Sequence, residues 1–431
     1  MQASHHIVIV GGGAGGLELA TRLGKKLAKI TLVDEQSTHL WKPLLHEVAA
    51  GTLDAGQDVL NYFVHASLHH YHFQLGRMVG LNRQAKEIIL APVTNGHDEE
   101  IIPKRTLAYD TLVLAFGSVN NDFGIPGVRE HCLFLDDQLQ AEHFQQLFLK
   151  NLLRLQNRID DQEAKKISIV IVGGGATGVE LAAELHYTVL QAATFGLDRI
   201  NPQQDIQITL IESSARILSA LPERISRLAK LELQRRGIEV LAGERVNQVG
   251  AHSIQTLNNR VLPATIVVWC AGISIPVFAD KLDGLELNRL NQIVVYDTLQ
   301  TTVDQNIFAF GDCACCPQAH IQQPVPPRAQ AANQQAQLLA QSLPAYLRGQ
   351  TLIPFKYTDY GSLISLSKFH TLGNLMGKLM GNILIEGKIA RLVYLSLYKK
   401  HQIILQGYGP VILQTLANFL TRGVRPRLKL H

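Results

Sequence analysis

The sequence predicts an α/β fold built around two copies of one strand–turn–helix unit. The copies are IVIVGGGAGGLELA at 7–20 and IVIVGGGATGVELAAE at 169–184; in each, an apolar run leads through G-x-G-x-x-G into a helical segment. In such a turn the first glycine permits the bend, the second lets a pyrophosphate reach the backbone, and the third lets helix and strand pack closely. We therefore expect two Rossmann-like dinucleotide-binding domains in one chain, an arrangement suited to relaying electrons between two dinucleotides.

The acid that ends the strand after each copy refines this prediction. KITLVDE ends in Asp34, with Glu35 as the alternative, and IQITLIES ends in Glu212. A carboxylate here accepts hydrogen bonds from ribose hydroxyls and repels a 2′-phosphate, so Glu212 favours NADH over NADPH. The second acid follows its glycines at a longer distance than usual, which indicates an inserted helical segment at about 186–200.

Composition is that of a folded protein of two or three domains, with 431 residues, 46% hydrophobic and 18% charged. No apolar run approaches the ~18 residues needed to cross a bilayer. The first apolar run, 7–10, enters a glycine turn and is therefore a strand, not a secretory signal. Five cysteines, an odd number, do not suggest a disulfide framework. We expect a protein that is cytosolic or faces the cytosol.

The order of patterns predicts one nucleotide domain interrupted by another and then completed. TLAYDTLVLAFGS (106–118) closes the first portion with a strand and a glycine turn, a helix is expected at 139–159, and residues 291–314 supply further strands. The expected divisions are 1–120 for the first domain's first part, 121–290 for the second domain with linkers, 291–349 for the first domain's second part, and 350–431 for a C-terminal region.

The C-terminal region carries an excess of positive charge. Between 388 and 431 there are eight basic residues and no acidic one, although the net charge of the whole chain is only +4. Such asymmetry predicts a polyanionic surface as partner. The basic residues are Lys388, Arg391, Lys399, Lys400, Arg422, Arg425, Arg427 and Lys429.

Two amphipathic segments, 388–406 and 410–422, accompany that charge. They are too short to span a membrane but long enough to lie in its interface. The second is the cleaner, with a single apolar stripe of Ile412, Leu413, Leu416, Phe419 and Leu420. The alternative is that these stripes pack on the protein's own core or in a homodimer. No aromatic–basic reader motif supports nucleic-acid binding.

These motifs resemble those of the two-dinucleotide flavoproteins and, among them, bacterial type II NADH:quinone oxidoreductases. The resemblance covers essentially the whole chain and is carried by GGGAGGLE, HLWKPLLHEVA, YDTLVLAFGS, GGGATGVELAAELH, NIFAFGDCA, PPRAQAANQ and RPRLKLH. It implies an FAD-dependent enzyme of the respiratory chain that passes hydride from NADH to flavin N5 and two electrons to a membrane quinone, ubiquinone or menaquinone, without pumping protons. It also implies a peripheral protein on the cytoplasmic face of the inner (plasma) membrane.

The resemblance assigns the two glycine turns to different nucleotides. It implies FAD contacts from Gly11, Gly13, Gly16, Asp34, Gly117, Gly311, Asp312, Ala329 and Gln330, with Asp312 accepting ribityl hydroxyls. It implies NADH contacts from Gly173, Gly175, Gly178, Glu180, Glu212 and Gly272. For Glu180 two interpretations stay open: an acid favoured by the helix dipole, as Glu18 is at the same offset, or a gate at the nicotinamide. No metal and no acid–base catalytic residue are expected, because the flavin supplies the redox chemistry.

The segment PPRAQAANQQ carries the candidate quinone site. Gln330 and Gln334 are four residues apart and share one face of a helix. An amide can bond either a quinone carbonyl or a quinol hydroxyl. We expect Gln335 and Gln337 to face solvent, and Asn333 stands where some relatives carry histidine.

A disulfide reductase of the same fold would need a cysteine pair after the first helix, and 36–60 contains no cysteine, which argues against that function. Two other functions stay open. A sulfide:quinone oxidoreductase needs well-placed cysteines, whereas Cys132, Cys270 and the C-x-C-C group at Cys313, Cys315 and Cys316 lack an evident pairing, and that group is too cramped for zinc. An NADH-responsive flavin sensor would show no steady-state turnover.

Overall fold

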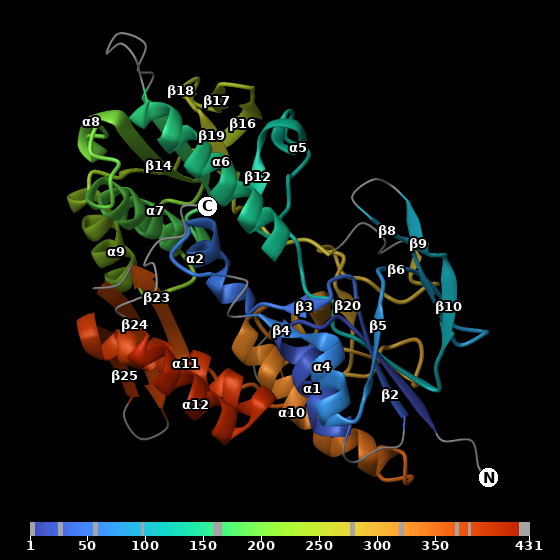
Figure 1. Ribbon diagram of the computed structural model, residues 1–431. Helices are drawn as coiled ribbons and strands as arrows, with labels where there is room; N and C mark the ends of the chain where they lie inside the picture. Colours follow the sequence, from blue (N-terminus) through green and yellow to red (C-terminus); the bar gives the residue numbers. More distant parts are fainter. Residues whose placement is uncertain are drawn as a thin grey trace. The chain divides into compact units, whose positions relative to one another are not determined.

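The computed structural model describes residues 5–24, 29–54, 59–95, 99–157, 166–275, 281–318, 323–366, 370–377 and 381–421. The chain forms two compact units (Figure 1). Unit 1 consists of Met1–Trp41, Val59–Val119 and Ser274–Asp359, and unit 2 of Lys42–Asp58, Asn120–Ile273 and Tyr360–His431. The expected boundaries at 120, 290 and 349 separate the parts of the chain that are expected to bind different ligands. That assignment of parts to ligands remains a proposal.

Unit 1 is organised by a five-stranded parallel sheet in the order β21-β11-β1-β2-β5. The strands are β1 (His6–Val10), β2 (Lys29–Asp34), β5 (His72–Leu75), β11 (Thr111–Leu114) and β21 (Ile307–Ala309). β1 and β11 are buried throughout, as expected for a parallel sheet covered on both faces. Because β21 comes from the later part of the chain, the prediction of an interrupted and completed nucleotide domain is confirmed.

Two helices lie side by side in this unit, α1 (Ala14–Gly24) and α10 (Ala329–Tyr346) (Figure 1). Helix α1 starts directly after β1 through the first glycine turn. The remaining elements of the unit are β3 (Thr38–His39), β4 (Leu60–Asn61), α4 (Tyr62–His69), β6 (Met78–Asn82), β7 (Glu87–Leu90), β8 (Val93–Thr94), β9 (Glu100–Ile102), β10 (Arg105–Ala108), β20 (Ile293–Val294), η3 (Gly311–Cys313) and β22 (Ala314–Cys315).

Unit 2 repeats the parallel sheet in the order β12-β19-β13-β14-β15. Its strands are β12 (Leu133–Phe134), β13 (Ile167–Val172), β14 (Ile206–Glu212), β15 (Glu239–Ala242) and β19 (Ile266–Trp269). The core beside this sheet includes the buried Trp269, whose Nε1–H donates to the Asn121 carbonyl oxygen at 2.7 Å. The second nucleotide-binding fold is therefore present as expected.

The helices of unit 2 show where the extra residues before Glu212 go. Helix α7 (Ala176–Thr194) runs on from the second glycine turn for 19 residues, so the segment expected as an insertion is largely a continuation of this helix. The helix expected at 139–159 is α6 (Gln138–Gln156). The other elements are η1 (Lys42–Leu44), α2 (Leu45–Ala49), α5 (Val128–His131), α8 (Pro202–Asp205), α9 (Glu223–Arg235), β16 (Val246–Val249), β17 (Ser253–Thr256) and β18 (Val261–Pro263).

The C-terminal region contains an antiparallel sheet that the sequence analysis did not anticipate. It consists of β23 (Gly361–Leu366), β24 (His370–Gly377) and β25 (Gly381–Glu386). Helices α11 (Gly387–Gln406) and α12 (Tyr408–Leu420) follow, close to the two expected amphipathic segments. Within the described ranges, no helix combines the length and apolar character that a membrane crossing demands.

Candidate functional site

The first glycine turn leaves room for a pyrophosphate. Gly11 has a φ of +106° and donates its N–H to the Val33 carbonyl oxygen at 2.8 Å, which makes the bend from β1 into α1. A Cβ on Gly16 would lie 1.9 Å from the Gly11 carbonyl oxygen, so this position tolerates no side chain. A Cβ on Gly13 would have nothing within 4 Å. The open space at Gly13, beside the N-terminus of α1, therefore fits a nucleotide phosphate.

The second turn reproduces this geometry in unit 2. Gly173 has a φ of +113° and donates to the Ile211 carbonyl oxygen at 2.8 Å. A Cβ on Gly178 would lie 2.0 Å from the Gly173 carbonyl oxygen, whereas a Cβ on Gly175 would meet nothing within 4 Å. The residues present at the start of α7 thus fit a second pyrophosphate.

Asp34, at the end of β2, is bonded directly to the first turn. Its Oδ2 accepts the Gly12 N–H at 2.6 Å and its Oδ1 accepts the Gln36 N–H at 2.8 Å. Burial raises the pKa of Asp34 to about 6, although these two backbone N–H groups oppose the shift. The structure therefore places Asp34, rather than the alternative Glu35, against the glycine turn.

Glu212, at the end of β14, is bonded in the same way to the second turn. Its Oε2 accepts the Gly174 N–H at 2.7 Å, and its Oε1 accepts the Ser214 N–H at 2.6 Å. Each acid therefore holds the glycine that follows the bend and keeps its remaining lone pairs beside the position where a ribose is expected.

The first turn has two supports that sequence reasoning missed. The Gly12 carbonyl oxygen accepts the Tyr62 hydroxyl at 2.6 Å, and His39 Nδ1 lies 3.0 Å from the same oxygen. Both side chains are buried, and burial raises the pKa of Tyr62 well above its usual value. No local motif marks these residues, because they reach the turn only through the fold.

Asp312 follows β21 in the turn that the resemblance assigned to FAD. Its Oδ2 accepts the Ser118 hydroxyl at 2.8 Å, and its backbone oxygen accepts the Gln292 amide at 2.9 Å. Gly117, one residue before Ser118, has a φ of +70° and open space where a Cβ would stand; Gly311 has a φ of +75°. The structure thus brings Gly117, Gly311 and Asp312 together in unit 1.

The two candidate quinone residues lie on the first turns of α10 and contact residues 358–359. The Gln330 amide donates to Asp359 Oδ1 at 3.1 Å. Gln334 exchanges two hydrogen bonds with the Thr358 backbone, 2.8 Å to its oxygen and 3.0 Å from its N–H. Arg328 forms an ion pair with Asp359 at 3.0 Å. Ala329 is exposed at the start of the same helix.

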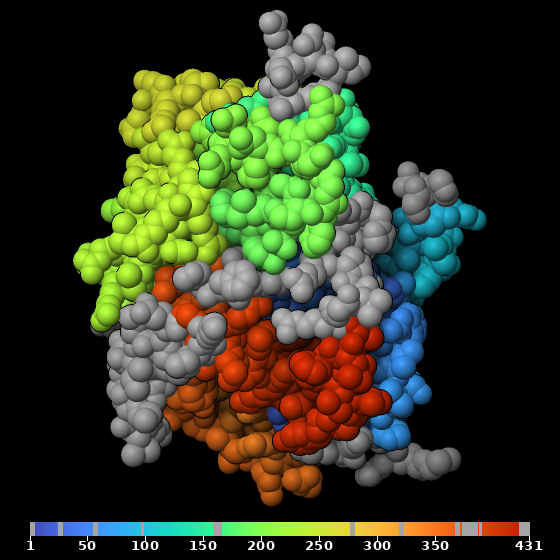
Figure 2. Space-filling model, turned by 60° about the vertical axis from the view of Figure 1, so that its left-hand side comes forward, coloured from blue at the N-terminus to red at the C-terminus, as the bar shows by residue number. Residues whose placement is uncertain are grey.

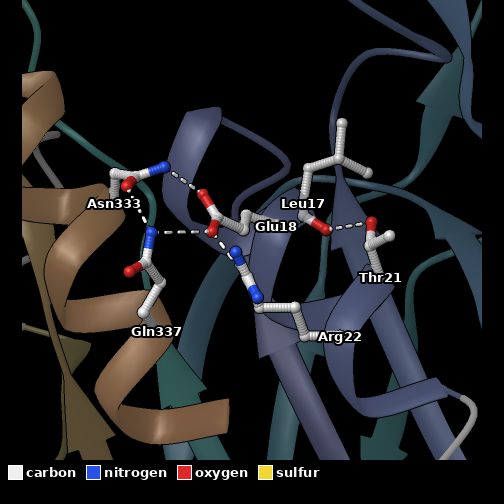
Figure 3. A network of polar contacts seen from close by, with 6 residues as sticks. All are labelled: Leu17, Glu18, Thr21, Arg22, Asn333 and Gln337. Atoms are coloured by element: carbon white, nitrogen blue, oxygen red, sulfur yellow. Dashed lines mark hydrogen bonds and ion pairs between the residues drawn. The ribbon is translucent and has the colours of Figure 1, made fainter. Parts of the chain in front are cut away.

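The expectation that Gln335 and Gln337 face solvent is wrong for Gln335, and Gln337 is only partly exposed. Gln335 is 1% exposed, and its Oε1 accepts the Gly311 N–H at 2.9 Å. Gln337 donates to Asn333 Oδ1 at 2.7 Å and to Glu18 Oε1 at 3.4 Å (Figure 3). A glutamine-rich pattern indicates polarity but not whether the amides bond water or other segments of the fold.

Glu180, in the first turns of α7, is a buried acid. Its Oε1 accepts the Ser365 N–H of β23 at 2.8 Å, and its Oε2 lies 3.6 Å from His46 Nδ1 of α2. Burial raises the pKa of Glu180 to about 8 and lowers that of His46 to about 4. The carboxyl group is therefore held by β23 and lies beside α2 within unit 2, contacts that its place near a helix N-terminus does not by itself explain.

Gly272 follows β19 in unit 2. It has a φ of +68°, and a Cβ there would lie 2.3 Å from the Phe123 ring and 3.1 Å from the Asn121 Cβ. A side chain at this position is therefore excluded by packing as well as by backbone conformation.

The five cysteines carry free thiols. Burial raises the pKa of Cys313 and of Cys316 to about 12, so neither is a ready thiolate. In the ranges given above, no three histidine, cysteine or acidic side chains form a group that could hold a metal ion.

The predicted apolar stripe of α12 is on the surface. Ile412, Leu413, Leu416, Phe419 and Leu420 are between 55 and 78% exposed. Val411 is buried, and α12 packs on α11 (Figure 2, red). The side chains of Arg391, Lys399 and Lys400 are described on α11, whereas the four basic residues after 421 lie outside the described residues.

Two glycine turns of matching geometry, each held by an acid, define a two-dinucleotide oxidoreductase. The model of the pyridine nucleotide-disulphide oxidoreductase family matches residues 5–336. The type II NADH:quinone oxidoreductase of Haemophilus influenzae is 44% identical over 99% of this chain and 100% of the relative. That of Staphylococcus aureus NCTC 8325 is 27% identical over 86% and 90%. The chain therefore belongs to the type II NADH:quinone oxidoreductases of the pyridine nucleotide-disulphide oxidoreductase family.

Solved structures agree on the fold. NDH2 from Plasmodium falciparum in complex with NADH has a TM-score of 0.82 at 19% identity, covering 99% of this chain and 100% of the other. The sulfide:quinone oxidoreductase of Aquifex aeolicus has a TM-score of 0.72 at 18% identity, covering 96% and 95%. At these identities the likeness concerns architecture alone.

Proposed function

We propose that this protein is an FAD-dependent NADH:quinone oxidoreductase. The observation that carries the proposal is the repeated site geometry, Asp34 on the first glycine turn and Glu212 on the second, in a chain of this family. When bound, FAD supplies the redox chemistry, taking hydride from NADH at N5 and releasing two electrons to a quinone. The protein binds and orients the two nucleotides and excludes competing reactions.

We assign FAD to unit 1 and NADH to unit 2. The FAD residues are Gly11, Gly13, Gly16, Asp34, Gly117, Gly311, Asp312, Ala329 and Gln330. The NADH residues are Gly173, Gly175, Gly178, Glu180, Glu212 and Gly272. The open spaces at Gly13 and Gly175 support both phosphate positions. The role of Glu180 as a gate at the nicotinamide end rests on the resemblance to the family.

We place the quinone at Gln330 and Gln334. Thr358 and Asp359 fix the orientation of both amides, so their polar atoms need little reorganisation on binding. The choice between ubiquinone and menaquinone depends on ring contacts, which a comparison of KM values for short-chain forms of both would measure.

A lipid-soluble acceptor requires docking at a membrane. We propose that the exposed stripe of α12 lies in the interface of an anionic bilayer, with each nearby basic residue adding about 1 kcal/mol. Peripheral attachment to the cytoplasmic face of the inner membrane follows from the NADH supply there. A second copy of the chain is the alternative occupant, and the molecular mass in solution without lipid distinguishes the two.

An anaerobic titration tests the function. NADH should bleach the flavin absorbance, NADPH should do so weakly, sulfide should leave it unchanged, and a short-chain quinone should then restore it. Bleaching by sulfide but not by NADH would favour a sulfide:quinone oxidoreductase. Bleaching by NADH without repeated turnover on quinone would instead indicate a sensor.

A further inference from the structure

A fully buried carboxylate joins the two helices of unit 1. Glu18 of α1 is 0% exposed. Its Oε1 accepts Arg22 Nε at 2.7 Å and Gln337 Nε2 at 3.4 Å, and its Oε2 accepts the Asn333 amide nitrogen (Figure 3). Gln337 also donates to Asn333 Oδ1 at 2.7 Å. The carboxylate is therefore bonded both within α1 and across to α10.

The donors and acceptors of this cluster admit one arrangement. Arg22 can only donate, and the oxygen of Asn333 is occupied by Gln337, so Asn333 must turn its nitrogen to Glu18. An ionised carboxylate, which only accepts, satisfies all three N–H groups. A glutamine at position 18 would place its own NH2 group against the NH2 group of Asn333.

The same helical turn of α10 has other partners on its other faces. Asn333 and Gln337 share one face, and Gln334 lies about 100° further around the helix, where it bonds Thr358. Gln335 bonds the Gly311 N–H. Helix α10 therefore cannot rotate or slide without breaking several bonds at once.

We propose that Asn333, through Glu18, is a positioning residue for quinone reduction. Glu18 stands two residues beyond Gly16, the last glycine of the FAD turn, and Asn333 immediately precedes Gln334. The Glu18–Asn333 bond is thus one of the bonds that fix the rotation of α10, and it ties the helix that presents Gln330 and Gln334 to the helix that begins at the flavin's pyrophosphate. This inference rests on the quinone site proposed above.

The test compares the two half-reactions of the purified holoenzyme. For Asn333→Leu we expect flavin reoxidation by a short-chain quinone to slow about tenfold, because small displacements of a binding group have large rate effects. Flavin content and the rate of reduction by NADH should stay within about twofold of the unaltered protein. Asn333→His, which keeps an N–H donor, should recover most of the rate. Gln341→Leu, an exposed glutamine one turn beyond Gln337, is the matched control.

A charge exchange gives a second measurement. Asn333→Asp sets two carboxylates together and should impair reoxidation, and adding Glu18→Gln should restore it in part, since one acceptor and one donor again face each other. If Asn333→Leu lowers only the melting temperature, or slows both half-reactions equally, this inference is overturned. If Gln334→Leu also leaves reoxidation unchanged, the proposed quinone site fails; if Gln334→Leu impairs it while Asn333→Leu does not, only the positioning role fails.

Discussion

Asp34 and Glu212 end corresponding strands in two separate sites, and each accepts hydrogen bonds from two backbone N–H groups at corresponding positions. Each accepts the N–H of the glycine after the bend, Gly12 or Gly174, and the N–H of the residue two positions further along its own strand end. The longer side chain of Glu212 makes both bonds as Asp34 does. The two sites are therefore built on one plan, and the second can be altered without touching the first.

Replacing Glu212 should relax the choice between NADH and NADPH. In Glu212→Ser the carboxylate that repels a 2′-phosphate is gone, so we expect the ratio of kcat/KM for NADH to that for NADPH to fall roughly tenfold, about 1.4 kcal/mol. Glu239→Gln, on the neighbouring strand, should leave the ratio unchanged. An unaltered preference in Glu212→Ser would remove this residue from nucleotide selection.

Two glycines of the second turn should respond differently to the same added methyl group. Gly175→Ala has room and an ordinary negative φ, so the protein should fold and retain FAD, yet its KM for NADH should rise because the methyl group occupies the phosphate's approach. Gly178→Ala would set its Cβ 2.0 Å from the Gly173 carbonyl oxygen and should destabilise unit 2. Isothermal titration of nucleotide binding and thermal unfolding separate the two effects. Equal loss of stability in both variants would contradict the assignment of Gly175 to phosphate approach.

These glycines and acids were predictable because each depends on a few neighbouring residues along the chain. The residues that hold these glycines and acids in place from other parts of the chain were not predictable. Tyr62 and His39 reach the Gly12 carbonyl, and Ser365 reaches Glu180 across 185 residues, through strand and helix packing that leaves no periodic signal. The antiparallel sheet of 361–386 was missed for a related reason: its glycine-rich strands lack a clear alternation of apolar and polar residues.

Charges placed on the α12 stripe should detach the protein from membranes. In Leu416→Glu with Phe419→Glu, two side chains that are more than half exposed become negative, so the fold should persist while sedimentation with anionic vesicles is lost. NADH oxidation with a soluble acceptor should continue. Val411, which is buried, is not a suitable position for this test. If the double variant still sediments with anionic but not neutral vesicles, apolar insertion by α12 is unnecessary.

The raised pKa of Glu180 should make the free energy of unfolding depend on pH. Its pKa of about 8 in the folded protein lies above the usual 4.5, so its contribution to stability is full below pH 4.5 and is lost as pH rises through about 8. The loss should approach about 1.4 kcal/mol per pH unit within that window. Glu180→Gln keeps an oxygen for the Ser365 N–H but cannot ionise, so its advantage over the unaltered protein should grow between pH 5 and pH 9.

Urea unfolding at pH 5, 7 and 9 measures this difference, with the exposed Glu223→Gln as a control that should show none. His46 affects stability at acidic pH. Its pKa of about 4 lies below the usual 6.5, so its contribution is full above pH 6.5 and is lost as pH falls through about 4. Because His46 is present in both the unaltered protein and Glu180→Gln, the two should lose stability alike at acidic pH. Their free energies of unfolding should differ increasingly only as pH rises. A constant difference at all three pH values would mean that Glu180 is already ionised in the folded protein, and that its bond to β23 holds a charge.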